Sequence, residues 1–118
     1  MLQVSPDNGI SSWDWCSGYH YSDSIVSGFS HLHLSGTGIG DLNDILLLPV
    51  SGKAALTKGT KEDMTTGYGS YFSHNNEVVK PGYYSVLLDK YNIKAELTAS
   101  ERVGFHKYTF NSADDAHV

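Results

Sequence analysis

The chain has 118 residues, 40% hydrophobic and 18% charged, which is the size and composition of one small globular domain. A net charge of −5 with only eight lysines and arginines excludes a surface that tracks nucleic-acid phosphates. No apolar run approaches the roughly 18 residues of a membrane-spanning helix. Met1 is followed by Leu-Gln-Val-Ser-Pro, without the features of a signal peptide. The single cysteine, Cys16, excludes an internal disulfide, and the compartment stays unknown.

The N-terminal half alternates short apolar runs with turn-rich segments. Residues 5–23 are rich in turn formers and aromatic residues, which predicts an ordered loop. Residues 25–34 predict a strand, and the continuous apolar run at 44–50 predicts a buried strand. Residues 51–76 mix charge, glycine and threonine, so we expect a long, mobile excursion.

The C-terminal half predicts three successive strands, at 83–89, 93–99 and 102–110. Apolar and polar residues alternate through 93–99, the period of a strand with one face in water. The short links between the runs indicate an antiparallel meander. The chain is therefore predicted to be all-β, a partial antiparallel β-sandwich with long loops and little helix. Its unpaired sheet edges suggest either a homo-oligomer or a piece of a larger protein.

Two neighbouring segments carry the polar groups of a candidate site. His31 and His33 lie two apart on a predicted strand and therefore project to the same face, as a metal pair, a polar binding pair or a structural pair. The glycines at 36, 38 and 40 follow this strand. They do not form a dinucleotide-binding loop, because position 43 is Asn and no helix of useful length precedes Pro49. We interpret this loop as backbone that a ligand or another domain can approach closely.

An aromatic cluster precedes these residues in the chain. Trp13 and Trp15 flank Asp14, and an indole face can stack on a sugar ring while polar neighbours bind its hydroxyls. The alternative is that both tryptophans fill the core beneath a loop. No carboxylate stands in an apolar setting that would raise its pKa, and no nucleophile elbow is present. The residues thus offer a binding surface and no complete catalytic set.

These segments resemble the N-terminal domain of glycoside hydrolase family 92, whose members are calcium-dependent exo-α-mannosidases. The most specific runs are Trp-Asp-Trp-Cys-Ser-Gly-Tyr-His-Tyr and Ser-His-Leu-His-Leu-Ser-Gly-Thr-Gly. The likeness covers nearly the whole chain outside the excursion at 51–71. The segments that carry it lie at 5–9, 13–24, 28–49 and 72–110.

The resemblance implies that two domains contribute differently to the active site. In the family, an N-terminal β-sandwich packs on a C-terminal (α/α)6 barrel, with the active site between them. Hydrolysis is inverting and uses a general acid and a general base. These groups and most calcium ligands belong to the barrel, which is absent here. Residues 1–118 are thus expected to be a single partial domain without catalytic residues or cofactor of its own, and inactive alone.

By motif position, the resemblance implies that this domain supplies one wall of the mannose site. The implied partners are α-mannoside glycans and the barrel domain, and the implied location is periplasmic or secreted. No residue is expected to bind metal. The expected substrate-binding residues are Trp13, Trp15, His31, His33, Gly36 and Gly38.

Two other functions stay open, and the chain departs from the family's usual pattern. It could be a stand-alone carbohydrate-binding module that uses Trp13, Trp15 and Tyr21 as a stacking platform, or a small metal-dependent β-fold protein built on His31 and His33. The family's usual opening segment is missing, and Leu32 stands where the family usually has threonine.

Overall fold

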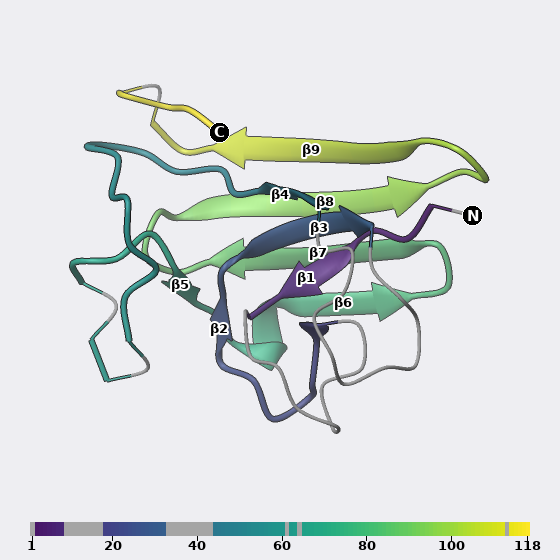
Figure 1. Cartoon of the computed structure of the whole chain (residues 1–118), viewed down its shortest axis with the longest axis horizontal. Helices are drawn as coiled ribbons and strands as arrows, with labels where there is room; N and C mark the ends of the chain where they lie inside the picture. Colours follow the sequence, from purple (N-terminus) through teal and green to yellow (C-terminus); the bar gives the residue numbers. More distant parts are fainter. Residues whose placement is uncertain (1, 9–17, 33–43, 61, 64, 113) are drawn as a thin grey trace.

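The computed structural model of the chain describes residues 2–8, 18–32, 44–60, 62–63, 65–112 and 114–118. Its elements are arranged in layers of antiparallel strands (Figure 1). Within the described residues, no helix is long and apolar enough to span a membrane. The elements are β1 (Ser5–Asp7), β2 (Ile25–Val26), β3 (Gly28–Leu32), β4 (Asp44–Leu47), β5 (Ser70–Tyr71), η2 (His74–Asn76), β6 (Glu77–Lys80), β7 (Tyr83–Leu88), β8 (Ile93–Ala99) and β9 (Gly104–Phe110).

Two sheets form the sandwich, and a short strand pair extends it. A four-stranded sheet has the order β6-β7-β8-β9, and a three-stranded sheet of order β1-β3-β4 lies across its face (Figure 1). β2 and β5 pair separately. All strand pairs are antiparallel. The predicted fold class, a partial antiparallel β-sandwich, is confirmed.

The four-stranded sheet follows directly from the alternating sequence of the C-terminal half. In β8, Ile93, Ala95 and Leu97 are buried, whereas Lys94 and Thr98 are exposed. The turn from β7 to β8 places Asn92 at φ 51°, a left-handed conformation that asparagine tolerates better than most residues. The predicted meander over 83–110 is confirmed.

The core lies between the two layers. Phe29 of β3 is fully buried and stacks on Tyr108 of β9, with ring centroids 6.3 Å apart. Phe72, which follows β5, closes one end of the core at 7% exposure. The inward residues of the four-stranded sheet complete it: Val86, Leu88, Ile93, Ala95 and Leu97.

Two predicted strands differ from the structure. The run at 25–34 is divided at Ser27, because β2 pairs with β5 while β3 pairs with β1 and β4. The strand predicted at 44–50 ends at Leu47, and Ile45 and Leu46 are 58% and 43% exposed. The prediction that this run is buried was wrong, because β4 lies at the edge of its sheet.

The excursion at 51–76 is more structured than the sequence indicated. Its final part forms β5 and η2. Tyr68 N–H donates to the carbonyl of Thr57 at 2.7 Å, which closes the loop on itself. The Tyr91 hydroxyl donates to the carbonyl of Tyr68 at 2.7 Å, and the Lys90 ammonium donates to the carbonyl of Gly67. Residues just after β7 therefore fasten this loop to the sheet.

Candidate functional site

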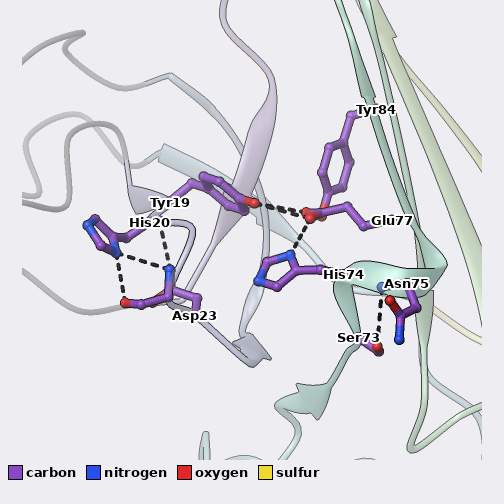
Figure 2. A network of polar contacts seen from close by, with 9 residues as sticks. Tyr19, His20, Asp23, Ser73, His74, Asn75, Glu77 and Tyr84 are labelled. Carbon is purple, nitrogen blue, oxygen red and sulfur yellow. Dashed lines mark hydrogen bonds and ion pairs between the residues drawn. The ribbon is translucent and has the colours of Figure 1, made fainter.

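A buried carboxylate is the centre of the first polar cluster (Figure 2). The Glu77 side chain, at the start of β6, is only 4% exposed. Its Oε1 accepts hydrogen bonds from the hydroxyls of Tyr84 at 2.7 Å and Tyr19 at 3.1 Å. Its Oε2 accepts from His74 Nδ1 at 2.5 Å and from Tyr19 at 3.2 Å. Both oxygens are thus supplied with donors, as a buried charge requires.

The His74 imidazole is held by its backbone and by two neighbouring rings. Ser73 caps η2 by accepting a hydrogen bond from Asn75 N–H at 3.3 Å, which fixes the short helix that carries His74 (Figure 2). Tyr21 stacks on the imidazole at 4.4 Å between centroids, and Phe72 meets it edge-on at 5.2 Å. The hydrogen bond to Glu77 raises the pKa of His74 above 6.5, which favours the imidazolium form beside the carboxylate.

The two tyrosines act as donors only. Burial and the neighbouring Glu77 raise the pKa of both Tyr19 and Tyr84 well above 10, so both hydroxyls keep their protons. Tyr19 belongs to the segment that precedes β2, whereas Tyr84 belongs to β7. The cluster of Tyr19, His74, Glu77 and Tyr84, here named the Glu77 cluster, therefore ties that segment to the four-stranded sheet.

A tight turn presents an exposed aromatic ring next to this cluster. His20 N–H donates to Asp23 Oδ2 at 2.8 Å, and Asp23 N–H donates back to the carbonyl of His20 at 2.9 Å (Figure 2). Between them, Tyr21 is 73% exposed. The turn thus holds one face of Tyr21 on His74 and leaves most of the ring in water.

A second polar cluster joins the two sheets. His31 Nε2, on β3, lies 2.5 Å from His106 Nε2, on β9. On its other side, His106 Nδ1 lies 2.6 Å from the Tyr108 hydroxyl. Burial, and secondarily the His31 imidazole, lower the pKa of His106 to about 4, whereas burial raises that of Tyr108 to about 12. His106 is therefore neutral near pH 7.

The predicted substrate-binding residues fall largely outside the described part of the chain. Of that set, only His31 is described. Its side chain is half-buried and contacts His106. Asn8 N–H donates to the carbonyl of Gly18 at 3.1 Å, and Leu32 pairs with Asp44. Each contact joins two residues that flank a part of the chain outside the described residues. The remaining predicted substrate-binding residues lie in those parts: Trp13, Trp15, His33, Gly36 and Gly38.

Several residues of the two clusters were not singled out from the sequence. Glu77 and Tyr84 were missed because no spacing relates them to Tyr19, which lies 58 residues from Glu77. His106 could have been found, since it shares the inward parity of Tyr108 and Phe110 on the predicted third strand. Across the described residues, no group of three or more His, Cys, Asp or Glu side chains is placed to hold a metal ion.

An apolar cavity of about 290 Å³ lies beside β1, between that strand and the β6–β7 hairpin. Its walls include Pro6, Tyr19, Val79, Tyr84 and Leu97. The Tyr19 and Tyr84 hydroxyls are turned to Glu77, so their rings present apolar surface to the cavity.

The fold and its clusters define a class: an antiparallel β-sandwich domain with one polar cluster around Glu77 and a second one between its two sheets. The sequence matches the glycosyl hydrolase family 92 N-terminal domain across residues 1–118. The chain belongs to this family. A search of curated proteins found no match.

Solved structures give the same result. The structure of the family GH92 α-mannosidase BT3965 from Bacteroides thetaiotaomicron is 44% identical in sequence, with a TM-score of 0.90 over 98% of this chain. Its complex with mannoimidazole matches with the same identity and TM-score. The chain spans only 16% of the first of these chains and 15% of the second.

Proposed function

We propose that the chain is a non-catalytic N-terminal domain piece of an α-1,2-mannosidase of glycoside hydrolase family 92. The observation that carries the proposal is the 44% identity to an α-mannosidase over 98% of this chain. Because the chain corresponds to 16% of that enzyme, the reaction itself is assigned to the remaining polypeptide.

The proposal divides the chemistry between this domain and that remainder. Inverting hydrolysis needs one carboxylic acid to protonate the leaving oxygen and one carboxylate to activate water. We assign both groups, and the Ca²⁺ that the resemblance implies, to the barrel domain of the family. The buried carboxylate described here, Glu77, is a poor candidate for either role, since three side chains already donate to it.

The role proposed for this domain is one wall of the mannose site. Trp13 or Trp15 would stack on the sugar ring, and His33 with the backbone at Gly36 and Gly38 would supply polar contacts. His31 would support this wall from β3, because its Nε2 faces His106 inside the sandwich. The identity to a protein solved in complex with mannoimidazole supports a sugar-facing role.

An activity assay tests the proposal that this chain alone does not catalyse hydrolysis. The 118-residue chain is incubated with α-1,2-mannobiose and Ca²⁺, and released mannose is measured. The expected result is no release above the uncatalysed background, because the proposed acid and base are absent. Clear turnover that is lost on heat denaturation would overturn the proposal.

Calorimetry with mannose oligosaccharides separates this function from that of a stand-alone carbohydrate-binding module. A single wall should bind weakly, since a sugar site normally encloses most of its ligand. Saturable binding by the isolated chain that disappears in the double variant Trp13→Ala, Trp15→Ala would favour the module instead.

A further inference from the structure

The two histidines that join the sheets form a pair of facing nitrogen ligands. His31 Nε2 and His106 Nε2 are 2.5 Å apart, and their ring centroids are 4.5 Å apart at an interplanar angle of 34°. At this separation the two nitrogens can neither both carry a proton nor both present a bare lone pair. One nitrogen therefore donates its proton to the lone pair of the other, and a metal ion that binds both lone pairs can take the place of that proton.

We propose that His31 and His106 bind one divalent transition-metal ion, Cu²⁺ or Zn²⁺, which bridges β3 and β9 with water completing its coordination. Neutral imidazole is the preferred ligand for these ions, whereas Ca²⁺ and Mg²⁺ prefer oxygen ligands. This site is separate from the Ca²⁺ assigned above to the family's barrel domain and does not depend on the proposed function.

Two features of the described residues favour metal binding at this pair. The Nδ1 of His106 lies 2.6 Å from the Tyr108 hydroxyl, and when Nδ1 donates its proton to that hydroxyl, the His106 Nε2 is left with a bare lone pair. Both imidazoles are half-buried, so water can reach the ion.

The surrounding side chains hold the two rings in position. The His106 ring meets Phe29 edge-on, with centroids 6.3 Å apart. Gly104 lies beside His31, where a Cβ atom would come within 3.4 Å of Cε1. Zinc binds imidazole nitrogen at about 2.0–2.1 Å, so a tetrahedral ion needs the nitrogens about 3.3 Å apart. Small rotations of the two rings, totalling somewhat less than 1 Å at the nitrogens, would accommodate the ion.

Thermal unfolding of the 118-residue chain tests the site, with His31→Gln and His106→Gln as variants and His20→Gln and His117→Gln as matched controls. We expect Zn²⁺ at tenfold above its dissociation constant to raise the unfolding midpoint by about 5 °C, and Ca²⁺ or Mg²⁺ to leave it unchanged. The shift should vanish in the first two variants and persist in both controls. No Zn²⁺ shift in the wild-type chain, or an equal shift in folded His31→Gln and His106→Gln, would overturn the proposal.

Electron paramagnetic resonance of the Cu²⁺-loaded wild-type chain decides the matter even if both variants fail to fold. Two coordinated imidazoles give hyperfine coupling from two equivalent nitrogens. This result supports the site provided that the same spectrum appears in His20→Gln and His117→Gln. A spectrum with one nitrogen, or one altered by either control substitution, would show that Cu²⁺ binds elsewhere and would contradict the proposal.

Discussion

At the scale of single residues, buried polar groups rather than apolar contacts distinguish this sandwich. Glu77 is almost fully buried, yet both carboxylate oxygens are satisfied by tyrosine and histidine donors. A buried charge of this kind adds little net stability, but removal of the groups that donate hydrogen bonds to it lowers the free energy of unfolding strongly. The Glu77 cluster therefore acts mainly through geometry, since it fixes where Tyr19 and Tyr21 lie relative to β6 and β7.

The first prediction concerns Glu77→Gln. The glutamine side chain cannot form an ion pair with His74. Its amide N–H₂ group would also face side chains that now donate to the carboxylate, so two donors would oppose each other. We expect the free energy of unfolding to fall by about 3 kcal/mol, as for a buried ion pair that loses one partner. Urea denaturation measures this change, and Glu62→Gln, on the exposed loop, is the matched control. Equal midpoints for the two variants would contradict the role given to Glu77.

The second prediction concerns the pH dependence of the His74–Glu77 pair. Because the folded-state pKa of His74 lies above 6.5, the stabilisation it gives is complete at lower pH and is lost as pH rises through that pKa. The difference in stability between wild type and His74→Gln should therefore be larger at about pH 5.5 than at about pH 9. Denaturation at both values provides the measurement, and a difference that grows toward alkaline pH would refute the assignment.

At the scale of elements, strands were predictable wherever the alternation of apolar and polar residues is long enough to select one face. β7, β8 and β9 satisfy this condition, and their meander was predicted from the sequence. β1 and β2 are too short to show a period, and β6 carries two exposed valines at an edge. β1 and β2 exist because they pair with distant strands, β3 and β5, which local sequence does not encode, whereas β6 pairs with the neighbouring strand β7.

The candidate site divides in the same way. His31 could be selected from the sequence because His-Leu-His is a local pattern on a strand. Its partner His106 lies 75 residues away and is brought to it only when the two sheets pack. The Glu77 cluster likewise joins Tyr19 to residues 55 to 65 positions further along. Tertiary contacts over such separations leave no spacing signal in a single sequence.

The third prediction concerns the β7–β8 hairpin. Leu88 is fully buried and pairs with Ile93 across the turn, so Leu88→Ala should leave a cavity at the end of the core. We expect a loss of about 3 kcal/mol in the free energy of unfolding. Leu56→Ala is the matched control, because Leu56 is 95% exposed and should change stability by less than about 0.5 kcal/mol. Similar losses in both variants would show that this hairpin does not anchor the core.

At the scale of the whole molecule, the sandwich leaves its outer strands open. Among the described residues, β6 and β9 end the four-stranded sheet, and β6 exposes Val78 at 40% and Val79 at 67%. An exposed apolar edge strand is a template for pairing with another chain. The domain is thus suited to an intermolecular or interdomain contact along β6.

The fourth prediction follows from this edge. The 118-residue chain should associate as its concentration rises, and Val79→Lys should shift the association to higher concentration, since a lysine on an edge strand opposes further pairing. Light scattering over a dilution series is the measurement. Val103→Lys, in the turn before β9, is the control at 48% exposure. A monomer at all concentrations, or equal effects of both lysines, would exclude β6 as the contact.

The hydrogen bond from Asn8 to Gly18 and the pairing of Leu32 with Asp44 have a consequence for protein engineering. Each contact marks a place where a segment can be exchanged. The chain outside the two contact residues belongs to the described fold, and the sequence between them is rich in aromatic residues in one case and in glycine in the other. Because the entropy of closing a loop grows only slowly with its length, cassettes of different length can be exchanged between such points without redesign of the sheets. The domain can thus serve as a frame on which the two segments of related mannosidases are swapped one at a time.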